Sequence, residues 1–185
     1  MAKSTFFLRA EVNAGNNQTR VEEIIDLGAY VNLGSTKPQV LRIHSIQVAY
    51  TDSLGLTPTV SAASAVGDTK TAFAVAAITT KQSSLPVGPS PAGAMPRLSD
   101  DDSVFTSAIL MSNSNDTADQ GIGSGATDLA PQHLENGYLV GVDNLYLYGF
   151  ADDAWNEDVY ISICMECSVE PATRENAINL ALSQA

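Results

Sequence analysis

Apolar and polar residues alternate with a period of two along residues 158–169, near the end of the chain. Successive side chains of a β-strand point to opposite faces, so this alternation predicts a strand with one buried face. We expect the strand to lie in the centre of a sheet. The apolar residues of the pattern are Val159, Ile161, Ile163, Met165, Cys167 and Val169.

Shorter patterns of the same kind recur along the chain. They predict strands at residues 5–12, 19–27, 38–51, 104–111, 138–142 and 145–150. We expect the first two to pair across a turn-rich connection. The last two should form a tight hairpin at Asp143 and Asn144, because both residue types tolerate turn conformations. Asn136-Gly137 is a second turn signal just upstream.

Two regions depart from simple alternation. Within residues 38–51 the apolar phase changes, which predicts a β-bulge near His44 and Ser45. Residues 59–80 are ambiguous, because many alanines favour a helix while the β-branched and aromatic residues between them fit strands. There we expect two strands that turn at Gly67-Asp68.

Two long stretches carry no clear strand pattern. Residues 81–99 contain four of the eight prolines and should be largely extended. Residues 112–137 are rich in Ser, Asn, Asp, Thr and Gly. Structureless loops longer than ~12 to 15 residues usually serve a function or are disordered. We expect neighbouring chains to hold these two loops in place.

The end of the chain carries a helical pattern instead. Pro171 suits a helix start, and apolar residues then recur at i, i+3, i+4 and i+7. These residues are Ile178, Ala181, Leu182 and Ala185. We expect residues 171–185 to form a short amphipathic extension whose Ile178, Ala181 and Leu182 contact a neighbouring subunit. The alternative is a tail that packs on its own domain, residues 1–170.

The elements together predict one all-β domain. A chain of 185 residues with 44% apolar residues can bury a single sizeable core. About eight strands without a βαβ rhythm favour a single jelly-roll sandwich or barrel, with long loops and a short C-terminal helix.

The net charge of the chain indicates which classes of molecule it can bind. Nine Lys and Arg residues against 21 Asp and Glu residues give a formal net charge of −12. Because this charge repels phosphate backbones and no basic cluster reverses it, it argues against direct nucleic-acid binding. No segment reads as a signal peptide or a transmembrane helix, so we expect synthesis in a cytoplasm and a soluble product.

The residue types needed for catalysis are almost absent. Neither of the two histidines, His44 and His133, lies in a recognisable catalytic motif, so we expect no enzyme. Cys164 and Cys167 have a C-x-x-C spacing. They lie within a strand, where positions three apart face opposite sides, so we interpret them as structural. The glycine-rich residues 121–125 lack the lysine and the helix of a phosphate-binding loop.

Two clusters could bind a ligand. Asp100, Asp101 and Asp102 are weak candidates for a structural divalent cation, and a solvated acidic turn is the simpler interpretation. No other cofactor is expected. Aromatic residues between 138 and 155 could form a sugar-binding platform, which makes a carbohydrate-binding jelly roll the main alternative function. Such a face more often belongs to a core or a subunit interface than to a sugar-binding site.

This combination resembles a known family. An acidic chain with jelly-roll strand content, the Pro/Ser-rich residues 81–99, the Ser/Asn/Gly-rich residues 112–137 and no catalytic set is similar to the small single jelly-roll major capsid proteins. These belong to tailless icosahedral viruses with an internal membrane, of the halophilic archaeal or thermophilic bacterial type. The resemblance covers nearly the whole chain in architecture, size and charge.

The resemblance implies a structural protein of a virion capsid. Such a chain would associate with itself and with a second, related capsid protein. It would contact the internal viral membrane and would be assembled in the host cytoplasm. No active-site residues carry over from the family.

Overall fold

The most regular sequence pattern forms the central strand of one sheet. The computed structural model describes residues 4–84, 88–89, 95–114, 122–127 and 132–184. In it, β10 (Val159–Pro171) has a strand on each side, so the prediction of a central strand is confirmed. Its apolar phase faces the core, where Ile161 and Met165 are fully buried.

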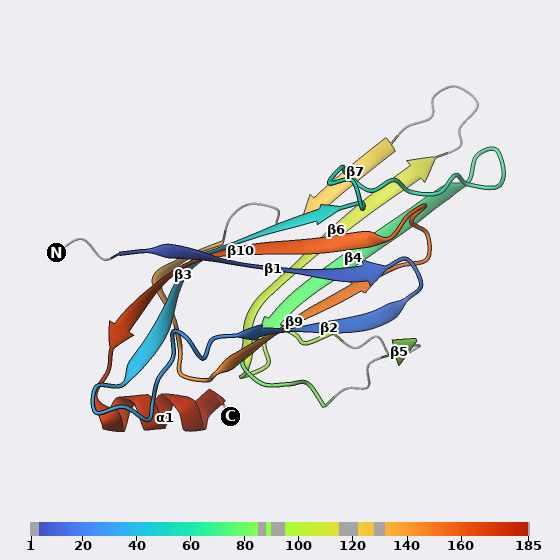
Figure 1. Cartoon of the computed structure of the whole chain (residues 1–185). Helices are drawn as coiled ribbons and strands as arrows, with labels where there is room; N and C mark the ends of the chain where they lie inside the picture. The colour runs from blue at the N-terminus through green and yellow to red at the C-terminus, as the bar shows by residue number, and fades with distance from the viewer. Residues whose placement is uncertain (1–3, 85–87, 90–94, 115–121, 128–131, 185) are drawn as a thin grey trace.

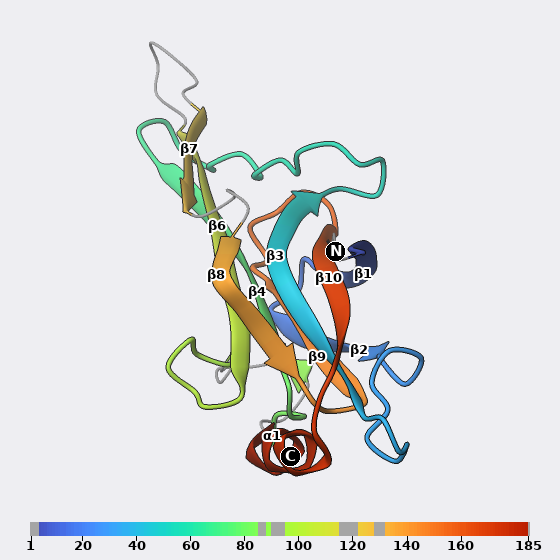
Figure 2. The ribbon, with the colours of Figure 1, turned by 90° about the vertical axis from the view of Figure 1, so that its left-hand side faces the viewer.

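The described strands form two sheets that pack face to face (Figures 1 and 2). The four-stranded sheet contains, in spatial order, β1 (Phe6–Gly15), β10, β3 (Gln39–Thr51) and β8 (Gln132–Val140). The six-stranded sheet contains β5 (Gly88–Pro89), β2 (Thr19–Asp26), β9 (Asn144–Ala151), β4 (Thr69–Thr79), β6 (Ser103–Ser114) and β7 (Ile122–Thr127).

The order of pairing is that of a jelly roll. When the extra edge strands β5 and β7 are set aside, the first strand pairs with the last, the second with the next to last, and so on inwards. The pairs are β1 with β10, β2 with β9, β3 with β8, and β4 with β6. This long antiparallel hairpin is rolled up, because β10 also pairs with β3 and β9 with β4. The predicted jelly-roll fold is confirmed.

Two predicted hairpins are wrong for the same reason. β1 and β2 follow one another in sequence but lie in different sheets, and so do β8 and β9. The connection at Asp143 therefore crosses between the sheets, where the Asp143 carbonyl accepts a hydrogen bond from the Leu27 N–H at 2.7 Å. Turn-forming residues indicate that the chain reverses, but the jelly roll decides which strands pair.

Other expected boundaries also change. Residues 59–68 form no first strand and contribute only an isolated bridge between Val60 and Trp155, whereas the expected turn at Gly67 is present with a φ of 88°. The stretch 112–137 includes β7 and the start of β8. Gly137 lies inside β8 with a φ of 69°, so the expected Asn136-Gly137 turn is an irregularity within a strand.

The predicted bulge is confirmed. Along β3, Ile43 and Ser45 pair with consecutive residues of β10, which leaves His44 as the extra residue. The ladder between β3 and β8 is irregular at the same place. The bulge returns Ile46 to the core after Ile43, so both isoleucines are buried despite their odd spacing.

Candidate functional site

The C-terminal helix α1 (Arg174–Gln184) lies at one end of the sandwich, as Figures 1 and 2 show. Pro171 is the last residue of β10 and not the helix start expected from the sequence. Thr173 caps the helix instead: its hydroxyl oxygen accepts a hydrogen bond from the Asn176 N–H at 3.3 Å. The chain therefore passes from sheet to helix within two residues, which holds α1 close to the barrel.

The face of α1 that contacts the barrel differs from the predicted apolar stripe. Ala177 is buried, and Leu180 packs so closely over Gly141 that a Cβ there would lie 3.0 Å from the leucine. Gln184 is buried as well. Its Oε1 accepts from the Gly141 N–H at 2.8 Å, and its Nε2 donates to the Leu139 carbonyl at 2.7 Å. A polar residue thus completes the contact by satisfying backbone groups at the end of β8.

The predicted stripe is divided between the two sides of the helix. Ala181 is partly buried, whereas Ile178 is 43% exposed and Leu182 72% exposed. Ala185 lies outside the described residues. Ile178 and Leu182 are four residues apart, so they adjoin on the outward surface of α1. The helix contacts its own barrel through one face and presents two large apolar side chains on another.

An open groove of about 700 Å³ is lined by residues of both α1 and β8 beside this contact. Asp101 lies on its border, while the Asp100 carboxylate accepts a hydrogen bond from the Arg97 N–H at 2.8 Å and shapes a turn. Among the described residues, which include Asp102, no three His, Cys, Asp or Glu side chains are grouped to hold a metal ion. The acidic cluster has the geometry of a solvated turn.

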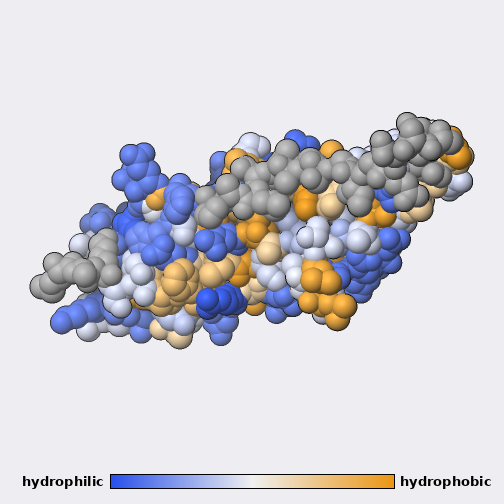
Figure 3. Space-filling model, turned by 90° about the horizontal axis from the view of Figure 1, so that it is seen from above, coloured by the Kyte–Doolittle hydropathy of each residue, from blue (hydrophilic) through white to orange (hydrophobic). Residues whose placement is uncertain are grey.

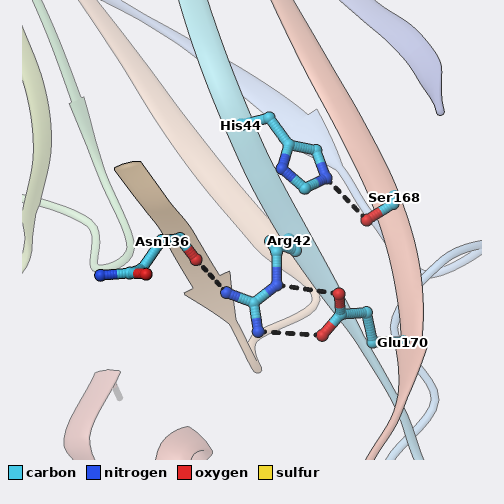
Figure 4. Close-up of polar contacts among 5 residues, drawn as sticks. All are labelled: Arg42, His44, Asn136, Ser168 and Glu170. Carbon is cyan, nitrogen blue, oxygen red and sulfur yellow. Dashed lines mark hydrogen bonds and ion pairs between the residues drawn. The ribbon is translucent and has the colours of Figure 1, made fainter. Parts of the chain in front are cut away.

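His44 and His133 lie on the neighbouring strands β3 and β8, and neither borders the groove beside α1. His44 lies at the bulge, where its Nε2 is 2.8 Å from the hydroxyl of the buried Ser168 (Figure 4). Beside it, the Arg42 guanidinium forms an ion pair with Glu170, with two N–O distances of 2.9 Å, and donates to the Asn136 carbonyl. These contacts join β3, β8 and β10, so the group has a structural role.

The two cysteines are free thiols on opposite faces of β10, as their spacing predicts. Cys167 lies in the core, and burial raises its pKa to about 12, so the thiol stays protonated at neutral pH. Cys164 borders a groove on the outer face of the sheet, together with Arg9 and Gln47. Because a sheet separates the two sulfur atoms, they are not arranged as a redox pair or as a shared metal site.

The aromatic cluster does not form an open platform. Trp155 is 2% exposed and donates its indole N–H to the Phe73 carbonyl at 3.0 Å, while Tyr148 is completely buried. Burial raises the pKa of Tyr148 to about 12. The three aromatic side chains on one face of β9 are therefore largely packed within the molecule: Tyr146, Tyr148 and Phe150.

The sequence did not indicate that Arg20 covers the Tyr148 ring. Arg20 is 1% exposed, and its guanidinium lies 5.1 Å from the centre of the Tyr148 ring. It also donates to the Ser83 hydroxyl at 3.3 Å, and the Ser83 N–H donates to the Tyr148 hydroxyl at 2.7 Å. Arginine is rarely buried without partners, and nothing local in the sequence indicated that these partners would converge.

No protein-family model matches the sequence, and no curated protein matches it. Solved structures with a similar fold do exist. VP1 of the trichodysplasia spinulosa-associated polyomavirus, in complex with 3′-sialyllactose, is 9% identical. The match covers 91% of this chain and 94% of that chain with a TM-score of 0.52.

The chain has the jelly-roll fold. Two other polyomavirus VP1 structures match less well. Apo VP1 of New Jersey polyomavirus is 9% identical over 92% of this chain and all 100% of that chain, with a TM-score of 0.48. The unassembled VP1 pentamer of Merkel cell polyomavirus is 7% identical over 92% and 97%, with a TM-score of 0.47. At these identities the likeness concerns the fold alone.

Spanning a bilayer requires a helix of sufficient length and hydrophobicity. Within the described part of the chain, α1 is too short and too polar to cross a bilayer, and no other helix is present there that could.

Proposed function

We propose that this chain is a structural protein of an icosahedral virus capsid and acts by self-association. The observation that carries the proposal is the jelly-roll order of the strands, which the chain shares with a polyomavirus VP1 over nearly its whole length. The protein would belong to a virion, assembled in the host cytoplasm. A second, related capsid protein and an internal viral membrane would be its further contacts.

The outward surface of α1 supports this role. Exposed apolar side chains on a soluble monomer are unfavourable in proportion to their area, and the chain itself covers Ile178 only in part and leaves most of Leu182 exposed. We place the subunit contact at these two residues, with Ala181 at its border. The jelly-roll domain, residues 1–170, would form the wall, and the extension, residues 171–185, would reach the neighbour.

The arrangement of titratable groups favours a structural role over an enzymatic one. In the described parts of the chain, His44 joins β3 to β10 through Ser168, the Asp100 carboxylate holds a turn, and no three His, Cys, Asp or Glu side chains are grouped to bind a metal ion. The alternative function, carbohydrate binding, is less well supported, because Tyr148 and Trp155 are buried. The bound sialyllactose belongs to the polyomavirus protein.

Electron microscopy of the purified chain, with sedimentation over a concentration series, tests the proposal. We expect ring-shaped or closed assemblies of uniform size. Mass spectrometry of particles isolated from the native source should find this chain as a major protein component. A monomer at every concentration, together with the chain's absence from any particle, would overturn the capsid role.

A further inference from the structure

The first strand of the fold, β1, leaves one of its two edges open. β1 pairs with β10 along one edge, from Phe6 to Gly15. Among the described residues, no strand pairs with the other edge. A groove of about 320 Å³ lies there, between residues 8–11 of β1 and residues 23–26 of β2. Alternate residues of such an edge direct free N–H and C=O groups outwards, which can pair with a further strand.

The open edge also leaves core residues incompletely covered. Leu8 and Ala10 point towards the interior, yet both are only partly buried, whereas Ile163 and Met165 of the adjacent β10 are buried. A strand added beside β1 would cover both residues. Natural proteins usually protect a long edge strand with a proline, a bulge or a covering loop. The ladder of β1 with β10 is irregular only between Asn13 and Gly15 and regular from Phe6 to Asn13.

The outward side of β1 carries one positive and one negative charge two residues apart. Arg9 lies over the Phe7 ring at 5.7 Å, and no carboxylate among the described residues forms an ion pair with it. Glu11 accepts a hydrogen bond from the Ser162 hydroxyl through Oε2 at 2.5 Å, so its Oε1 is available for a second partner. Both side chains are exposed.

We propose that β1 pairs antiparallel with β1 of a second copy of this chain, across a twofold axis at Ala10. In this register Arg9 of each copy faces Glu11 of the other, and Leu8 faces Val12. The two four-stranded sheets then form one continuous sheet. The proposal deepens the proposed function, since it rests on contact between copies and names the surface that makes it.

Charge and side-chain direction select this register. Shifting it by one residue would place inward-facing residues opposite outward-facing ones, which breaks the sheet pattern. Shifting it by two would place Arg9 opposite Arg9, or Glu11 opposite Glu11. Only the register centred on Ala10 forms two pairs of opposite charge, and directly opposed charges of unlike sign stabilise antiparallel strands. The complementarity of β1 with itself identifies the partner as a second copy.

Charge exchange tests the contact. In Arg9→Glu, two Glu–Glu contacts replace the two ion pairs, and in Glu11→Arg two Arg–Arg contacts do so. We expect each variant to raise the dimer dissociation constant about tenfold or more in sedimentation equilibrium. The double variant Arg9→Glu/Glu11→Arg restores opposite charges and should recover the affinity. Arg97→Glu is the matched control for Arg9→Glu: it lowers the net charge by the same amount on an exposed turn and should have little effect.

The possible failures are distinguishable. If the native chain associates and all variants associate equally, the β1 contact is wrong while the proposed function stands. The same holds if the single variants are weakened but the double variant is not rescued. If the native chain stays monomeric under every condition, self-association fails and both proposals fall. Circular dichroism of each variant confirms that the fold is retained.

Discussion

Ile163 is the residue on which the core of the four-stranded sheet depends most directly. It lies in the middle of β10, between paired strands, and is 2% exposed. Ile163→Asp would bury a carboxylate without a partner. We expect the variant not to fold, with a loss above about 4 kcal/mol. Circular dichroism and thermal unfolding would show this.

A matched control lies one residue further along. Cys164 points to the outer face of the same strand, directly opposite Arg9 of β1. Cys164→Asp should therefore fold with nearly native stability. A native melting temperature for Ile163→Asp would contradict the assignment of the buried face.

Asp152 should make the protein more stable in mild acid. Burial raises the pKa of Asp152, and the adjacent Asp153 raises it further, although the Ala154 N–H donates to Asp152 Oδ1 at 2.8 Å. The folded state therefore keeps a proton that the unfolded state has released. This occurs between the ordinary aspartate pKa and the raised value, so the free energy of unfolding falls as the pH rises through that interval.

Asp152→Asn should remove this dependence. The amide keeps the oxygen that accepts from Ala154 and carries no charge at neutral pH. Because the side chain is partly exposed, we expect a gain of less than about 1 kcal/mol at neutral pH. Urea unfolding across a pH series measures it. Asp153→Asn serves as the control and should have a smaller effect; destabilisation by Asp152→Asn at neutral pH would contradict the assigned direction.

At the scale of single residues, the sequence predicted where a backbone irregularity lies better than it predicted which side chains contact each other. The change of apolar phase around His44 located a real bulge, because a bulge shifts the alternation that burial imposes. The partners of Arg20 could not be found in the same way. Its contacts with Ser83 and Tyr148 join residues that are more than sixty positions apart, and they depend on the folding of the whole sheet.

At the scale of elements, the existence of strands was easier to predict than their partners. Alternation with a period of two follows from one buried face and is therefore visible in β10, β6 and β3. A turn signal, in contrast, is the same whether the chain returns within a sheet or crosses to the other one. The expected hairpins failed on this point, since β8 and β9 lie in different sheets.

The C-terminal helix shows a related limit. Its apolar spacing predicted a helix correctly but not which face docks, because Gln184 contributes two hydrogen bonds that hydrophobicity does not reveal. Backbone groups at the end of β8 need partners, and a glutamine can satisfy both a donor and an acceptor. The apolar residues Ile178 and Leu182 consequently remain outside.

This division of faces yields a prediction for α1. The double variant Ile178→Ser/Leu182→Ser should lower the extent of assembly several-fold while leaving the melting temperature unchanged, because both side chains lie outside the barrel contact. Leu180→Ala and Gln184→Ala are the contrasting variants. They should lower stability by about 1 to 3 kcal/mol through lost packing and unpaired backbone groups. Sedimentation and thermal unfolding separate the two effects, and a large stability loss in the double serine variant would refute the assignment.

At the scale of the whole molecule, the jelly roll leaves its sheets open at their sides. Among the strands that the structure describes, β1 and β8 end the four-stranded sheet, so rolling up the hairpin does not close every edge there. Seen from above, the surface shows several separate hydrophobic patches between hydrophilic areas (Figure 3). The open edge and the apolar residues of α1 lie at different places on the molecule, so contacts through them would run in different directions.

The net charge opposes all of these contacts at once. With a formal charge of −12, each copy repels the others over a distance set by ionic strength: about 10 Å at 0.1 M salt and about 3 Å at 1 M. Screening should therefore strengthen assembly as sodium chloride rises across this range. The Arg9–Glu11 pairs are also screened, but only a few charges contribute to them, whereas the repulsion sums over the whole chain.

Sedimentation velocity at fixed protein concentration would measure this, with the average sedimentation coefficient rising as salt is added. Magnesium chloride at matched ionic strength provides the control. If screening alone acts, both salts should give nearly the same curve; a much stronger effect of magnesium would indicate that a divalent cation bridges carboxylates between copies. Assembly that weakens steadily with sodium chloride would show that attraction between opposite charges outweighs the repulsion, and the net charge would then not be what limits association.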